Sequence, residues 1–173
     1  MENDKRETLA ARLLTVGALT AEPGQTPRLH WVSQRALENE SLRRELVFAL
    51  SELIRDHYSA ADALLGDEWA EAAAAQLELP LVREELPEKP ALILGSSEEA
   101  EAYLPRLIEL RRSGGSPAIA VIWNAGDEDL RMRLDRADIR CHWLTDLESG
   151  AAAALQRGML DFDDYCRLLP WAQ

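Results

Sequence analysis

The nine residues Ala91-Leu92-Ile93-Leu94-Gly95-Ser96-Ser97-Glu98-Glu99 decide how this chain is organised. An apolar run, a glycine and then small polar and acidic residues predict a buried strand that turns into the N-terminus of a helix. In an open α/β sheet, such a turn is the usual place for a ligand, above all for a phosphate. Gly95, Ser96 and Ser97 are therefore the first candidate ligand-binding positions.

Apolar segments on either side alternate between the lengths of strands and helices. Strands alternating with helices in this way predict βαβ units, and hence an α/β fold with a parallel sheet covered by helices on both faces. The loop between the first two elements is expected at 21–27. We expect strands at 28–33, 63–66, 79–82, 91–94, 118–123 and 139–144, and helices at 5–15, 39–54, 68–77, 98–112, 127–136, 146–157 and 161–169.

Composition excludes several classes of function. The 173 residues carry 31 acidic and 19 basic side chains, a formal net charge of −12, which argues against nucleic acid and against an anionic membrane as partner. No apolar run approaches the ~20 residues of a membrane span. The charged start predicts a chain without a signal peptide, located in the cytoplasm, where Cys141 and Cys166 are expected to be reduced thiols.

Two further strand ends carry candidate ligand-binding residues. Gly66 and Asp67 follow the strand at 63–66, and Asn124 follows the strand at 118–123. Asp67 reads first as the N-cap of the next helix, with a ligand contact as the alternative. Asn124 stands where the binding crevice of such folds lies.

The central turn also has two interpretations. Ser96 and Glu99 match a capping box, in which the serine accepts from the Glu99 amide and the glutamate reaches back to the serine. The alternative keeps Gly95, Ser96 and Ser97 as a nest of amides for a weakly charged ligand. Ser113-Gly114-Gly115-Ser116 follows a helix rather than a strand, so we interpret it as a helix C-cap.

Motifs for metal or cofactor chemistry are missing from the sequence. His30, His57 and His142 stand far apart in the sequence, and none stands at metal-ligand spacing from a cysteine or an acid. No sequence of the GxSxG, P-loop or GxGxxG type occurs. We therefore predict no metal site, no cofactor and no catalytic residue of these classes.

Taken in order, several segments resemble the orotate phosphoribosyltransferase family of the type I phosphoribosyltransferases. The resemblance implies a single phosphoribosyltransferase-like domain over 1–173, a three-layer α/β/α fold with a central, mainly parallel sheet. Its parts would be an N-terminal helix and hood-like segment at 1–38, an α/β core at 39–147 and C-terminal helices at 148–173. The matching segments are Leu13-Leu14 through Thr20, Gly24-Gln25-Thr26-Pro27 with Leu29-His30-Trp31, Glu40 to Ile54, Leu77 to Val82, His142 to Leu147, and Gly158-Met159-Leu160 with Asp164-Tyr165.

The chain departs from the family where the family's chemistry lies. The resemblance implies a phosphate loop after paired acids, but Gly95–Ser97 stands there without that pair and with glutamates behind it. Gly66-Asp67 replaces a glycine-rich pyrophosphate loop, and the residues from Arg83 to Pro90 leave no room for a mobile catalytic loop.

These departures lead to a hypothesis and an alternative. The hypothesis is a catalytically inactive orotate phosphoribosyltransferase-like protein with a binding, regulatory or structural role. The alternative is a divergent phosphoribosyltransferase that acts, with Mg²⁺, on orotate or another base with phosphoribosyl pyrophosphate. The resemblance also implies a homodimer, for which Trp31 and Trp69 are candidate interface residues. The small-molecule ligand stays unknown.

Overall fold

The computed structural model describes residues 2–83 and 86–169, which group into two compact units. The first unit contains the residues up to Arg43 and those from Thr145 onward, and the second contains Arg44–Leu144. The single-domain organisation stays a prediction.

The second unit is built on a four-stranded sheet of order β3-β4-β5-β6. β4 pairs in parallel with β3 and with β5, and the register places Ile93 beside Gly66 and Ser96 beside Trp123. Every residue of β4 is buried, as the apolar run predicts for a central parallel strand. The strands are β3 (Ala63–Gly66), β4 (Pro90–Ser96), β5 (Ala118–Asn124) and β6 (Arg140–Asp146, whose last two residues belong to the first unit).

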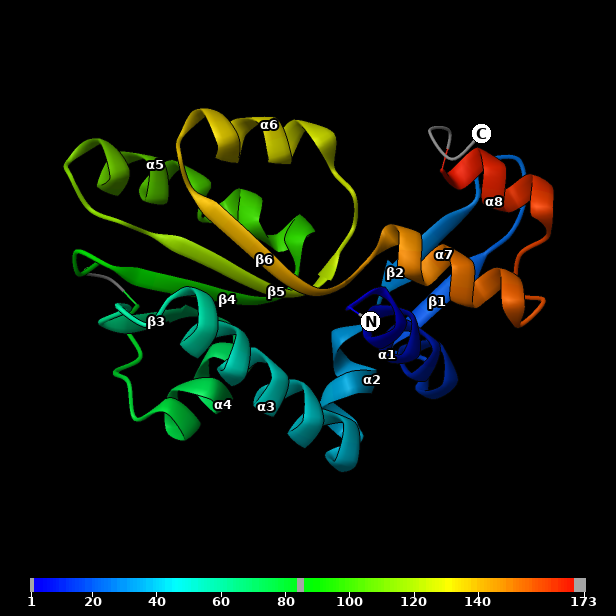
Figure 1. The fold of residues 1–173 in the computed structure, drawn as a ribbon, viewed down its shortest axis with the longest axis horizontal. Helices are drawn as coiled ribbons and strands as arrows, with labels where there is room; N and C mark the ends of the chain where they lie inside the picture. Colours follow the sequence, from blue (N-terminus) through cyan, green and yellow to red (C-terminus); the bar gives the residue numbers. More distant parts are fainter. Residues whose placement is uncertain (1, 84–85, 170–173) are drawn as a thin grey trace. The chain divides into compact units, whose positions relative to one another are not determined.

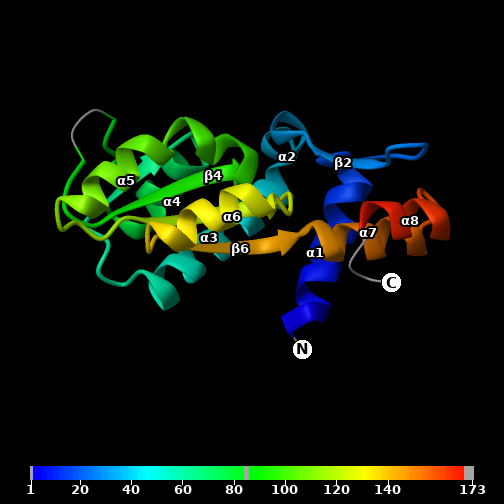
Figure 2. The same cartoon turned by 90° about the horizontal axis from the view of Figure 1, so that it is seen from above.

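Helices cover both faces of this sheet. α3 and α4 lie on one face and α5 and α6 on the other (Figure 1), a layering that Figure 2 shows from above. Leu92 and Leu94 of β4 join Ile119 and Val121 of β5 in a core packed against α5 and α6. The helices are α3 (Glu40–His57, which begins in the first unit), α4 (Glu68–Leu77), η1 (a 3₁₀ helix, Ser97–Ala102), α5 (Leu104–Arg112) and α6 (Glu128–Arg136).

The first unit combines a short antiparallel hairpin with four helices among its described residues. The Asp164 carboxylate accepts a hydrogen bond from the Gly24 amide at 3.1 Å, which fastens the hairpin turn to α8. The elements are α1 (Glu2–Val16), β1 (Leu19–Glu22), β2 (Arg28–Trp31), α2 (Ser33–Glu38), α7 (Leu147–Gln156) and α8 (Phe162–Leu168).

The α/β fold with a parallel sheet is confirmed, and four local predictions are wrong. β1 extends into the segment expected as loop, and α2 was not expected. The strand expected at 79–82 is reduced to a single bridge between Leu81 and Leu64. The helix expected at 98–112 is split into η1 and α5 because Pro105 has no N–H for the backbone hydrogen bond of a continuing α-helix.

No helix in the described ranges is both long and apolar enough to cross a membrane.

Candidate functional site

The structure gathers all six predicted site residues at one edge of the sheet. Because β3, β4 and β5 are parallel, their carboxyl ends meet at the same edge. Gly66 and Asp67 stand at the end of β3, Gly95–Ser97 at the end of β4 and Asn124 at the end of β5. We call this region the carboxyl edge.

Asp67 connects two of the three strand ends. One oxygen of its carboxylate accepts a hydrogen bond from the Trp69 amide at 2.9 Å, which confirms the predicted N-cap of α4. The other oxygen accepts from the Gly95 amide at 3.2 Å. The carboxylate therefore occupies amide donors at the start of α4 and at the end of β4, which are the donors that phosphate groups use at strand-to-helix turns.

Glu99 forms a carboxyl pair with Asp67. Partial desolvation and the neighbouring charge of Asp67 raise the pKa of Glu99 to about 7, with smaller contributions from Glu68 and Glu98. Burial raises the pKa of Asp67 as well, although its bonds from Trp69 and Gly95 oppose that shift. The hydrogen bond between the two carboxyl groups raises the pKa of Glu99 and lowers that of Asp67, so Glu99 is the acid of the pair that keeps its proton to higher pH.

Gly66 is required by packing between strands. Its φ of +142° is a conformation that residues with a side chain rarely adopt, and a Cβ there would lie 1.9 Å from the Ile93 carbonyl oxygen. The glycine after β3 thus allows β3 and β4 to approach. Its conformation is explained without a bound phosphate.

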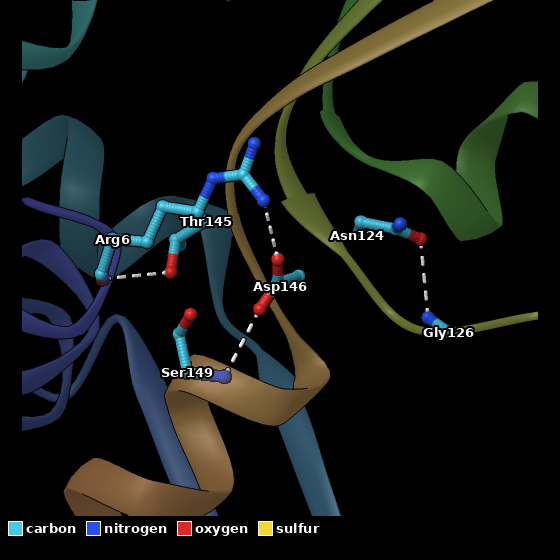
Figure 3. Close-up of polar contacts among 6 residues, drawn as sticks. All are labelled: Arg6, Asn124, Gly126, Thr145, Asp146 and Ser149. Atoms are coloured by element: carbon cyan, nitrogen blue, oxygen red, sulfur yellow. Dashed lines mark hydrogen bonds and ion pairs between the residues drawn. The ribbon is translucent and has the colours of Figure 1, made fainter. Parts of the chain in front are cut away.

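Ser97 and Asn124 connect the ends of β4 and β5. Ser97 Oγ accepts a hydrogen bond from the Ala125 amide at 3.0 Å and lies 3.5 Å from Asn124 Oδ1. That Asn124 oxygen also accepts from the Gly126 amide at 3.1 Å, as Figure 3 shows. Ser97 is 2% exposed, so both side chains hold the turn after β5 in place. Asp127 then caps α6, as predicted.

The predicted capping box is wrong in its partners. Ser96 Oγ accepts from the Glu98 amide at 3.3 Å rather than from the Glu99 amide. The segment begins as a tighter 3₁₀ helix, which brings an earlier amide within reach of the cap. The Glu99 side chain contacts Asp67 instead of returning to Ser96.

Two tryptophans expected in different roles are both in the core. Trp123 was expected there and is fully buried in β5. Trp69 was expected to serve an interface, but it is also fully buried, on the first turn of α4. A side chain with no exposed surface cannot contact a second copy in this conformation. Trp31 is half-buried, and Trp171 lies outside the described residues.

The Asp67–Glu99 pair is the main feature that sequence reasoning missed. A signal was present, because each acid follows one of two strands expected to be parallel neighbours. Asp67 was interpreted as a helix N-cap and Glu99 as part of a capping box, and neither interpretation indicates that the two acids are close. Among the described residues, no cluster of three or more histidine, cysteine, aspartate or glutamate side chains could hold a metal ion.

In the first unit, the end of β6 carries a separate polar cluster (Figure 3). Asp146 accepts hydrogen bonds from the Ser149 amide at 3.0 Å and from the Arg6 guanidinium at 3.1 Å. Buried Thr145 donates to the Arg6 carbonyl oxygen at 2.9 Å. These contacts cap α7 and fasten α1 to it, which gives the segment from His142 to Leu147 a structural role at its end.

Comparison with known proteins identifies the fold through structure alone. No protein-family model and no curated protein matches the sequence. Among solved structures, orotate phosphoribosyltransferase from Aeropyrum pernix matches with a TM-score of 0.67 at 20% identity, covering 87% of this chain and 99% of that one. The enzyme of the same name from Francisella tularensis matches with a TM-score of 0.66 at 13% identity, covering 94% and 92%.

A longer protein also matches. Leishmania donovani UMP synthase gives a TM-score of 0.69 at 15% identity over 95% of this chain, which spans only 41% of that protein. Adenine phosphoribosyltransferases match too, with TM-scores of 0.60 and below. The chain therefore has the α/β fold of the phosphoribosyltransferases, in the form found in orotate phosphoribosyltransferases.

Proposed function

We propose that this chain is a phosphoribosyltransferase-fold protein that does not catalyse phosphoribosyl transfer and serves a binding, regulatory or structural role. The observation that carries the proposal is the position of the Asp67 carboxylate on the amides of Trp69 and Gly95. A phosphate seated at this turn would need those donors. Here an acid of the chain itself already holds them.

Charge at the carboxyl edge supports the same proposal. Glu99 has Asp67, Glu68 and Glu98 as acidic neighbours, and their charges add to desolvation in raising the pKa of Glu99. Two like charges 4 Å apart repel by about 4 kcal/mol at an effective dielectric constant of ~20. A phosphorylated substrate would meet this repulsion in addition to losing its amide donors.

The short connection between Val82 and β4 is a second, independent support. Only residues 83–89 separate Val82 from β4, and residues 84–85 among them lie outside the described part of the chain. The preceding segment contributes the Leu81–Leu64 bridge rather than a full strand. The mobile loop that the family resemblance implies therefore has little chain from which to form.

One observation favours the alternative of a divergent transferase. The two adjoining carboxyl groups of Asp67 and Glu99 are oxygen ligands of the kind that Mg²⁺ accepts, together with waters and substrate phosphates. In that function, the acid pair would hold the magnesium complex of phosphoribosyl pyrophosphate. Proton loss from Glu99 would have to precede metal binding.

Calorimetry and an activity assay together test the proposal. We expect no turnover of orotate, followed by its ultraviolet absorbance, with phosphoribosyl pyrophosphate and Mg²⁺. An active orotate phosphoribosyltransferase assayed in parallel is the positive control. We also expect no Mg²⁺-dependent binding of phosphoribosyl pyrophosphate at the carboxyl edge.

A matched pair of variants tests whether any binding of phosphoribosyl pyrophosphate takes place at the carboxyl edge. If Mg²⁺-dependent binding occurs and is weakened by Glu99→Gln but not by Glu109→Gln, an exposed position on α5, the alternative replaces the proposal. Turnover of orotate would contradict the proposal directly.

A second copy of the chain is the partner that the family resemblance implies. Trp69 is buried and cannot serve a dimer interface. The proposal of a dimer is therefore supported by exposed large apolar side chains such as Phe48 of α3, which is 57% exposed. Light scattering coupled to size exclusion at micromolar concentration should report a dimer. A monomer at all concentrations would contradict this part of the proposal.

A further inference from the structure

A second candidate site lies at the amino ends of the strands, opposite the carboxyl edge. A cavity of about 240 Å³ opens there within the second unit. Its walls come from the end of α3, the starts of β4 and β5, the end of α5 and the turn before β6. We call it the amino-edge cavity. None of the six predicted site residues lines it.

The rim of this cavity is cationic in a chain with a net charge of −12. Lys89, Arg111 and Arg140 lie on it together with His57. Asp138 is its one acidic lining residue. Three formal positive charges against one negative charge make the cavity locally positive, so it would attract an anion that most of this protein's surface repels.

Arg111 and Asp138 largely neutralise each other. The Arg111 guanidinium forms an ion pair with the Asp138 carboxylate and donates to the backbone oxygens of Asp138 and Gly115, each at 3.2 Å. The hydrogen bond from Arg111, together with its charge, holds the pKa of Asp138 below the usual range, with a smaller contribution from Arg140. Arg111 therefore builds the wall, and it is not free to receive a ligand.

Lys89 and Arg140 are the cations left for a ligand. Within the described parts of the chain, neither side chain forms an ion pair, and both residues are exposed at the rim. The nearby Asp62 carboxylate accepts the backbone amide of Lys89, at 3.2 and 3.3 Å to its two oxygens. A further acidic residue, Glu88, lies beside the cavity, because its backbone oxygen accepts a hydrogen bond from the amide of the lining residue Ser116 at 2.7 Å.

The floor of the cavity is preorganised around Tyr58. Its buried hydroxyl donates to the Ile119 carbonyl oxygen at 2.8 Å and lies 2.6 Å from His142 Nδ1. The His57 ring stacks on the His142 ring with centroids 3.9 Å apart and an interplanar angle of 14°. His57 is thus held at the rim, so little conformational entropy of its side chain is lost when a ligand contacts it.

We propose that the amino-edge cavity binds a small anion that carries a phosphate group, with Lys89, Arg140 and His57 as its contacts. Two unpaired cations beside an imidazole match the charge of a phosphate dianion better than that of a single carboxylate. The volume of about 240 Å³ is below the roughly 300–1,000 Å³ of sites for drug-sized ligands, which favours an anion as small as a phosphomonoester. This site is independent of the proposed function, because it uses the opposite edge of the sheet.

Calorimetric titration with inorganic phosphate and with glycerol 3-phosphate at low ionic strength tests the proposal. We expect saturable binding that weakens as salt is added. Lys89→Gln and Arg140→Gln should each weaken it about tenfold, the effect of losing one charge-assisted contact. Arg112→Gln, which removes an exposed arginine of α5 outside the lining residues, should leave it within about twofold.

Two charge-conserving variants and one variant at the carboxyl edge complete the binding test. Lys89→Arg and Arg140→Lys should keep most of the affinity, and Glu99→Gln at the carboxyl edge should leave it unchanged. Tighter binding of glycerol 3-phosphate than of phosphate would identify a phosphorylated metabolite as the ligand, and equal binding would identify free phosphate. The proposal is overturned by the absence of saturable binding to either probe, or by an equal loss in Arg112→Gln.

Discussion

The carboxyl groups of Glu99 and Asp67 are joined by a hydrogen bond, although the two acids belong to different strand-to-helix turns. The same carboxylate accepts the amides of Trp69 and Gly95. One proton therefore completes a network that joins the ends of β3 and β4. The stability of the network depends on keeping that proton, which makes pH the first variable to test.

Stability should fall as pH rises through neutrality, and Glu99→Gln should remove this dependence. The pKa of Glu99 is raised from 4.5 to about 7 in the folded chain. The folded state then binds the proton more tightly than the unfolded state does, so the contribution is complete below pH 4.5 and lost through about pH 7. Denaturant unfolding of both proteins at about pH 5 and about pH 8 measures the change.

Glu98→Gln is the matched control for this experiment. It removes a carboxylate that is the smallest of the contributions raising the pKa of Glu99, so the fall in stability between the two pH values should persist, although it should begin at a slightly lower pH. An equal pH dependence in wild type and Glu99→Gln would show that no proton is held between Asp67 and Glu99.

Gly66→Ala should be much more destabilising than Gly24→Ala. The two glycines have nearly the same φ, +142° and +139°, but a Cβ meets the Ile93 carbonyl oxygen at 1.9 Å in the first case and nothing within 4 Å in the second. Backbone strain alone should cost about 1–3 kcal/mol at Gly24. Separating β3 from β4 should add to that at Gly66, for a total above about 4 kcal/mol.

Thermal unfolding of the two variants gives the comparison. Because the backbone strain is shared, the difference between them isolates the contact between Gly66 and Ile93. Similar losses in both variants would mean that the strands can separate at little cost.

The fold could be predicted from the sequence because its signals are local and strong. The apolar runs of β4 and β5 and the Asn39 cap, which accepts the Leu42 amide at 3.0 Å at the start of α3, each specify their element. Parallel pairing then brings the carboxyl ends together. These steps need no knowledge of side-chain positions, so the sequence is enough to place the six predicted residues at one edge.

The chemistry of that edge could not be predicted, because it depends on side-chain directions. The capping preference of the sequence predicted that Glu99 contacts Ser96. In the structure Ser96 accepts the Glu98 amide, and Glu99 contacts Asp67 at the end of the neighbouring strand. Trp69 was expected at an interface because tryptophan favours interfaces, but the first turn of α4 faces the core. The amino-edge cavity collects residues from five separate segments, and spacing in the sequence gives no sign of it.

Tyr58→Phe should destabilise the chain by about 1–2 kcal/mol, the cost of a buried hydrogen bond. The hydroxyl lost is the one that bonds the Ile119 oxygen and His142 Nδ1. Burial also raises the pKa of Tyr58 well above its usual value of 10. Since the unfolded chain loses this proton first, wild-type stability should fall as pH rises above about 10, and the variant should lack that contribution.

Tyr103→Phe is the control for this substitution, because Tyr103 lies in the same unit at the junction of η1 and α5. Tyr58 is unchanged in this variant, so the alkaline fall in stability should persist. An unchanged alkaline fall in Tyr58→Phe would mean that Tyr58 does not retain its proton in the folded state.

Ser97→Ala should free the turn after β5 without creating a phosphate site. The substitution removes the oxygen that accepts the Ala125 amide, at a cost of about 1–2 kcal/mol for a buried hydrogen bond. Hydrogen exchange should therefore quicken at Ala125. Ser113→Ala, whose hydroxyl bonds the Glu109 oxygen at an exposed helix end, should change stability by less than about 0.5 kcal/mol. If Ser97→Ala leaves exchange at Ala125 unchanged, Ser97 does not hold the turn, and the carboxyl edge is freer to accept a ligand than the Asp67 contacts imply.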